Sequence, residues 1–145
     1  MRNDTFKYVF LSWFGGSFYV TCEVLYRGRS HWSMFVLAAF IFVVCDLMNE
    51  VWSWDTSLVT QVFIGTCLAT FLEFVFGCIF NIWLGLGIWD YSSLPGNILG
   101  QICPQFTCLW VIAITVAIVL GDVIRWRFYG EERPRYRIGK KIFYI

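Results

Sequence analysis

Four apolar runs, each about 20 residues long, constrain the fold of this chain more than any other feature of its sequence. They cover residues 6–26, 33–52, 58–82 and 98–121. A helix needs about 20 predominantly apolar residues to cross the hydrocarbon core of a bilayer. The composition agrees, because only 14% of the residues are charged, whereas a soluble domain carries about 25%. The sequence therefore predicts an all-α membrane protein with four transmembrane helices in a single domain, residues 1–145.

The distribution of Lys and Arg predicts the orientation of these spans. An even number of spans places both termini on one side, which then carries nine basic residues, while the other side carries only Arg27 and Arg29. Because basic residues are retained on the cytoplasmic side, both termini are predicted to be cytoplasmic in a multi-pass protein of the cell (inner) membrane. Residues 125–145 are then a basic cytoplasmic tail, which can contact anionic lipids or equally bind a cytoplasmic partner.

The segment before the fourth span, from Gly85 to Asn97, is predicted to be a broken or interfacial loop. Its glycines and Pro95 prevent a continuous helix, yet its centre is too apolar for a solvated loop. Irregular backbone at membrane depth is tolerated only where protein or water satisfies it. We therefore expect this segment to lie in the interface or to fold back into the protein, and Pro104 to kink the fourth span.

Two carboxylates lie inside the apolar runs. Glu23 is near the end of the first run and Glu73 near the middle of the third, and each follows a glycine by eight residues, Gly15 or Gly65. A charged group at membrane depth costs about 3 kcal/mol unless it is protonated, paired or exposed to a water-filled cavity. The two similar rows favour a duplicated helical hairpin, although small residues also serve plain helix packing.

We predict a polar intramembrane site that opens outward, in which Glu23 and Glu73 face each other or share an arginine. The arginines can instead extend to the outer headgroups. Three acidic residues near the inner ends, Asp46, Glu50 and Asp122, are interpreted as ordinary surface ion pairs. The candidate substrate- or ion-binding residues are Glu23, Arg27, Arg29, Glu73, Asn81, Asp90 and Tyr91.

Familiar catalytic and metal-binding motifs do not occur in the sequence. It contains no G-x-x-x-x-G-K-[ST], no H-E-x-x-H and no G-x-S-x-G, which are the signatures of phosphate-binding loops, zinc proteases and serine hydrolases. The six cysteines fall inside apolar segments and are interpreted as small buried hydrophobes. We therefore predict no enzyme, no cofactor, no metal site and no nucleic-acid partner.

Several short motifs, spread over nearly the whole chain, carry a family resemblance. The most specific are Arg27-Gly28-Arg29-Ser30 and Trp89-Asp90-Tyr91; the others are Gly15-Gly16, Glu73 with Gly77 and Asn81, the run from Asn97 to Cys103, and Glu131 to Tyr136. With these motifs the chain resembles the CmpB-like family of small bacterial membrane proteins, described as ABC-transporter type IV. The resemblance implies a membrane subunit of a transporter, whose ATP-driven work would need a separate nucleotide-binding protein.

The leading hypothesis is an integral membrane transport protein in the lipid bilayer, either a permease subunit or a small transporter that works as a homo-oligomer. The alternative is a non-transporting membrane partner or lipid-binding protein, in which the polar cluster is structural. A third and weaker hypothesis is an enzyme that acts on a lipid headgroup through Asp90, Tyr91 and the arginines.

Overall fold

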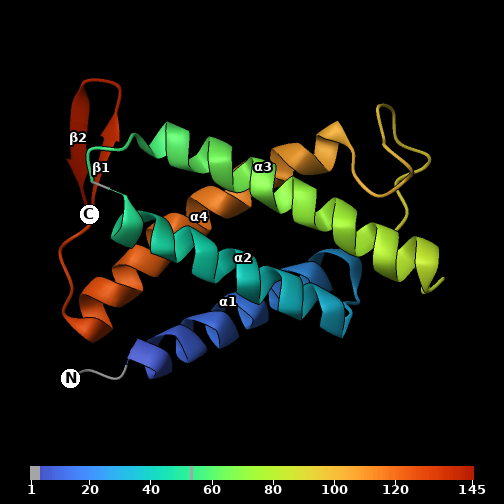
Figure 1. The fold of residues 1–145 in the computed structure, drawn as a ribbon, viewed down its shortest axis with the longest axis horizontal. Coiled ribbons are helices and arrows are strands. Elements are labelled where there is room, and N and C mark those ends of the chain that lie inside the picture. The colour runs from blue at the N-terminus through green and yellow to red at the C-terminus, as the bar shows by residue number, and fades with distance from the viewer. Residues whose placement is uncertain (1–3, 53) are drawn as a thin grey trace.

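Four long helices run antiparallel in the computed structural model, which describes residues 4–52 and 54–145 (Figure 1). Because the helices alternate in direction, the β-hairpin end of the bundle gathers the start of α1, the end of α2, the start of α3 and the end of α4. We call this the hairpin end and the opposite one the loop end. The elements are α1 (Asp4–Arg27), α2 (Trp32–Val51), α3 (Leu58–Phe76), the π-helix η1 (Gly77–Trp83), α4 (Pro104–Tyr129), β1 (Arg135–Ile138) and β2 (Lys141–Tyr144).

Three helical segments of the described chain are long and apolar enough to cross a membrane, namely Trp32–Val51, Leu58–Trp83 and Pro104–Tyr129. Helix α1 has 24 residues, which rise about 36 Å, so its length suffices. It carries Lys7 and, near its other end, Glu23 and Arg27, and it is less apolar than the other three helices. The predicted four transmembrane helices are therefore not confirmed, and three long apolar helices are.

The last predicted span was misplaced, and the fold is not purely helical. Helix α4 covers Pro104–Tyr129 instead of residues 98–121. Pro104 begins this helix and causes no kink, because the first residue of a helix needs no N–H partner inside it. The helix continues past Arg125, where we expected the tail to begin, and ends at Tyr129; the next residue, Gly130, has a φ of +64° and forms a left-handed cap. The rest of the tail forms an antiparallel hairpin of β1 and β2.

The connection between η1 and α4 folds back onto the protein. Ile88 and Trp89 are buried, with 8% and 5% of their surface exposed. The Ile88 amide donates to Asn81 Oδ1 at 2.7 Å, and the Trp89 indole N–H donates to the Gln101 carbonyl at 3.0 Å. Protein groups therefore satisfy this irregular segment, as irregular backbone in a membrane protein requires.

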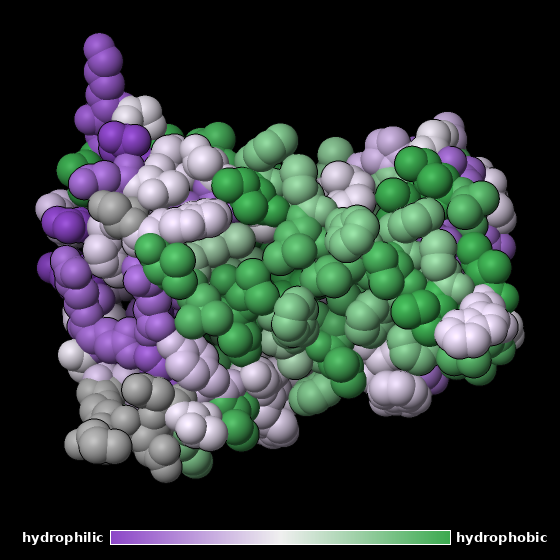
Figure 2. All heavy atoms as spheres, viewed as in Figure 1, coloured by the Kyte–Doolittle hydropathy of each residue, from purple (hydrophilic) through white to green (hydrophobic). Residues whose placement is uncertain are grey.

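Hydrophobic side chains cover the middle of the face seen in Figure 2, and hydrophilic ones gather at the hairpin end. Inside the bundle, α1 packs chiefly against α2. The contact is close because Gly15 has no side chain: a Cβ built there would overlap Cβ and Cγ of Phe42. Gly65 similarly brings α3 close to α4, since its Cβ would lie 2.6 Å from Cγ2 of Ile114. Small residues of this kind let membrane helices approach closely.

We expect Gly15→Ala to lower the free energy of unfolding by about 1–3 kcal/mol, because the added methyl group would displace Phe42 from a packed interface. The measurement is the midpoint of thermal unfolding in detergent. Leu25→Ala is the control, since Leu25 lies on the same helix and is 82% exposed. An equal midpoint for Gly15→Ala and the unaltered protein would contradict the close contact between α1 and α2.

Candidate functional site

The first polar site surrounds Glu73, where α3, α4 and the loop meet. The Glu73 side chain is buried, with 3% of the residue exposed. The Tyr91 hydroxyl donates to its Oε1 at 3.1 Å, and the Trp110 indole N–H donates to its Oε2 at 2.8 Å. Both donors are neutral, and within residues 4–52 and 54–145 Glu73 forms no ion pair. Two donors suit an ionised carboxylate, which only accepts hydrogen bonds.

Both donors to Glu73 are themselves held by aromatic neighbours. Tyr91 stacks on Phe106 with ring centroids 4.3 Å apart, and its backbone N–H donates to the Gly100 carbonyl at 2.8 Å. Burial raises the pKa of the Tyr91 phenol and the Glu73 carboxylate raises it further, so the hydroxyl stays protonated and able to donate. Trp110 stacks on Tyr19 with centroids 5.8 Å apart and planes at 9°.

The second predicted carboxylate, Glu23, has different partners. Its Oε1 lies 2.6 Å from Nη2 of Arg27, one helical turn further along α1, and its Oε2 accepts a hydrogen bond from the Ser30 hydroxyl. Arg27 Nη1 also approaches the Ile88 carbonyl at 3.4 Å. The pair therefore joins the end of α1 to both adjoining loops at the loop end.

The predicted site residues gather at the loop end, but Glu23 and Glu73 do not share an arginine as we expected. Among the described residues no arginine contacts both Glu23 and Glu73; Arg27 pairs with Glu23, which lies four residues before it on the same helix.

The remaining predicted residues are placed around the loop. Asn81 Nδ2 donates to Gln101 Oε1 at 2.8 Å, so this asparagine shapes the loop. Arg29 is exposed. Asp90 is exposed too, and its Oδ1 accepts from the Ser92 amide at 2.8 Å. The hydrogen bonds from Ser92 lower the pKa of the Asp90 carboxyl.

A larger polar cluster at the hairpin end centres on Arg125, whose surface is only 3% exposed. Its guanidinium nitrogens lie near carboxylate oxygens of Asp46 at 3.1 Å, Glu50 at 2.7 Å, Asp122 at 2.7 Å and Glu131 at 3.4 Å. One cation thus joins α2, α4 and the segment that follows α4.

Lys7 supplies a second cation to the same cluster from α1. Its Nζ lies 2.6 Å from Glu50 and 2.9 Å from Glu131. The Tyr8 hydroxyl also donates to Glu50. Through these contacts the start of α1 is tied to the end of α2 and to the residues beyond α4.

Neutral donors complete the cluster around Asp122. Asn49 Nδ2 donates to Asp122 Oδ2 at 2.5 Å, and the Tyr136 hydroxyl donates to the same oxygen at 2.7 Å. Burial raises the pKa of Tyr136, and the nearby Asp122 raises it further, so the phenol remains a donor. Strand β1 is thereby fixed to the end of α4.

The interpretation of Asp46, Glu50 and Asp122 as ordinary surface ion pairs was wrong for Asp46 and Asp122. Asp46 is 0% exposed and Asp122 is 2% exposed, whereas Glu50 is an exposed residue that pairs with Lys7 and Arg125. The available signal was their spacing: Asp46 and Glu50 are four apart, Asp122 and Arg125 three apart, so each pair shares a helix face. Because Arg125 precedes a run of basic residues, it was assigned to the tail instead of the helix.

Three long apolar helices with polar groups buried between them define this protein as an α-helical membrane protein. The chain belongs to the CmpB family, described as "Putative ABC-transporter type IV", whose family model matches residues 6–137. This match confirms the resemblance carried by the sequence motifs. No curated protein matches the chain, and no solved structure matches it.

We expect Arg125→Gln to lower the free energy of unfolding by about 3–5 kcal/mol, because it leaves buried carboxylates without their counter-charge. Thermal unfolding in detergent measures the effect. Arg127→Gln is the matched control: Arg127 is two residues away, exposed, and lies over the Trp126 ring at 4.3 Å, a contact worth about 0.5–1 kcal/mol. Equal losses for the two variants would show that the buried network does not hold the helices together.

Proposed function

We propose that this chain is a membrane transport protein, either a permease subunit or a small transporter that works as a homo-oligomer, with Glu73 as its ionisable centre. The observation that carries the proposal is the environment of Glu73. It is a buried carboxylate in an apolar helix, it contacts only neutral donors among the described residues, and no described cation pairs with it. Ionisable residues at membrane depth are costly and usually belong to ion, proton or substrate pathways.

The family description supports the same class of function. The 145 residues contain no phosphate-binding loop sequence, so ATP-driven transport would depend on a separate nucleotide-binding protein. Four helices enclose little volume, which favours assembly of two or more copies around a solute. We assign no catalytic role to the polar residues at the loop end.

For the membrane topology we propose that α1 is a fourth span beside the three apolar helices. Lys7 near its start contacts Glu131 at the hairpin end, and Arg27 at its end approaches Ile88 at the loop end. Helix α1 therefore extends from the hairpin end to the loop end, as its neighbours do. With most Lys and Arg at the hairpin end, the positive-inside rule puts this end, and both termini, in the cytoplasm of a cell-membrane protein.

The test is Glu73→Gln, measured for both transport and stability in the purified full chain. Proton flux requires no identified cargo, so it is followed with a pH-sensitive dye inside vesicles under an imposed potassium diffusion potential. We expect flux into vesicles with the unaltered protein and only the protein-free rate with Glu73→Gln. The thermal midpoint should stay the same or rise, because Gln keeps the shape and can bond both Trp110 and the Tyr91 oxygen without a buried charge.

Glu132→Gln is the control, since it makes the same chemical change at an exposed position of the described chain. It should leave both flux and midpoint unaltered. Vesicles with the unaltered protein that show only the protein-free rate, together with a lower thermal midpoint for Glu73→Gln, would contradict the transport proposal.

That last outcome would instead favour the second candidate function, a non-transporting membrane partner or lipid-binding protein. The observation in its favour is the hairpin-end cluster, where the carboxylates around Arg125 and Lys7 are paired within the chain itself. Such a cluster needs no solute to complete it. In this case the polar groups at both ends of the bundle would serve only to hold the helices together.

A further inference from the structure

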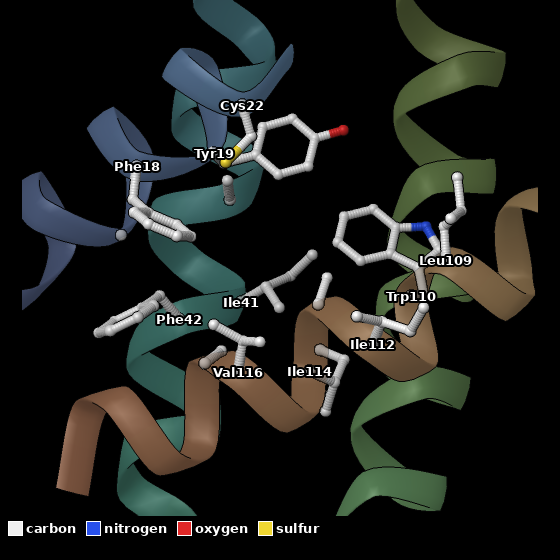
Figure 3. A pocket seen from close by; sticks show the side chains of 14 residues that line it. Phe18, Tyr19, Cys22, Ile41, Phe42, Leu109, Trp110, Ile112, Ile114 and Val116 are labelled. Carbon is white, nitrogen blue, oxygen red and sulfur yellow. The ribbon is translucent and has the colours of Figure 1, made fainter. Parts of the chain in front are cut away.

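A cavity of about 340 Å³ lies between α1, α2 and α4 (Figure 3). Small and apolar side chains line it, including Ala38, Ile41 and Ala113, and no charged side chain of the described residues does. Phe18, Leu109 and Ile112 at its border are 44%, 50% and 63% exposed, so it opens at the side of the bundle between α1 and α4. A volume of this size lies at the lower end of small-molecule sites, which span about 300–1,000 Å³.

One wall of this cavity is aromatic and is backed by a negative charge. Tyr19 and Trp110 both line the cavity and stack on each other with nearly parallel planes. The Trp110 indole N–H donates to Glu73 Oε2 at 2.8 Å. Glu73 itself does not line the cavity, so the indole ring separates the carboxylate from the cavity. The wall therefore presents aromatic rings to a ligand and a carboxylate just beyond them.

This arrangement attracts positive charge in two ways. The faces of aromatic rings carry partial negative charge and bind cations, most strongly when the site is dry. A carboxylate that accepts the indole N–H increases the electron density of the ring. The charge of Glu73, which no described cation balances, also acts across a medium of low dielectric constant, where electrostatic attraction is stronger than in water.

We infer that this cavity binds a hydrophobic organic cation, such as an aromatic or alkyl ammonium or phosphonium ion. The inference rests on the proposed function, because it names the class of solute that the transport protein would carry. The apolar walls remove the hydrocarbon part of the ligand from water, while Tyr19, Trp110 and Glu73 favour its charge. A neutral acyl chain would fill the same volume but would gain nothing from Glu73, and an anion would be repelled by it.

The probe is tetraphenylphosphonium, whose binding to the full chain in lipid nanodiscs is measured by titration calorimetry, with empty nanodiscs subtracted. Neutral triphenylphosphine oxide is the matched uncharged ligand. We expect saturable binding of the cation and at least about tenfold weaker binding of the neutral compound, the size of effect that a desolvated cation–aromatic contact gives. Glu73→Gln should weaken cation binding by a similar factor, and Glu132→Gln should not change it.

Two further variants keep the test independent of the folding of Glu73→Gln. Tyr19→Leu retains an apolar wall but removes a ring, so it should weaken binding of the cation and leave binding of the neutral compound unchanged. Ala113→Phe fills the cavity from α4 and should abolish binding of both. Equal affinity for the charged and neutral compounds, or unaltered cation binding in Glu73→Gln and Tyr19→Leu, would overturn the inference.

The outcome also separates this inference from the proposed function. If proton flux depends on Glu73 but the cation does not bind, the transport proposal stands and the solute class is wrong. If the cation binds through Glu73 but no flux occurs in vesicles, the site exists and the transport proposal fails.

Discussion

The structure depends on one buried guanidinium. Arg125 contacts carboxylates from α2, from α4 itself and from the segment after α4, and Lys7 from α1 shares two of them. Burial of these charges is costly, and once they are paired, removal of one partner leaves the others unpaired at a high cost. A shift of α4 by one residue would turn Arg125 away from these acids. The network therefore fixes the rotation and depth of the helices at the hairpin end, which dispersion contacts between apolar side chains cannot do alone.

At the loop end the buried carboxylate of Glu73 is not ion-paired, and this contrast supports separate roles for the two ends. There Glu73 accepts hydrogen bonds from neutral donors and pairs with no described cation. Its charge is therefore not neutralised by an ion pair between helices. An acid that has no counter-charge can respond to a proton or a cationic solute, whereas one that is fully paired cannot do so without breaking the fold. Glu23 lies at the same end but is paired with Arg27, and it therefore resembles the acids of the hairpin end more than it resembles Glu73.

The sequence predicted what depends on local composition and missed what depends on tertiary contacts. Apolar runs predicted α2 and α3 within a few residues, and Gly and Pro predicted the break before α4. The same method placed the start of the last span at residue 98, because hydropathy cannot distinguish the apolar Ile98–Cys103 stretch, where Ile98 pairs with Ile102 across a turn, from a helix. The partners of Glu73 were equally hidden: Tyr91 is 18 residues away and Trp110 is 37 away. Arg125 appeared to be one more basic residue of the tail, since only the packed α2 and α4 show that acids surround it.

The irregular segment at the loop end positions Tyr91 beside Glu73. Tyr91 reaches Glu73 only because the loop folds back, and the loop keeps that shape through Asn81 on η1 and through Gln101, which accepts from Asn81 and from Trp89. Gly77 at the start of η1 makes room for this arrangement, because a Cβ there would lie 2.5 Å from Gln101 Oε1. A π-helix is rare, occurs mostly as a short stretch within an α-helix, and is frequently found at functional sites. A regular helix through residues 77–83 would turn Asn81 away from the loop. The loop would then no longer be held in the shape that lets Tyr91 donate to Glu73. The departures from regular structure are thus concentrated around Glu73, a buried carboxylate that no described cation pairs.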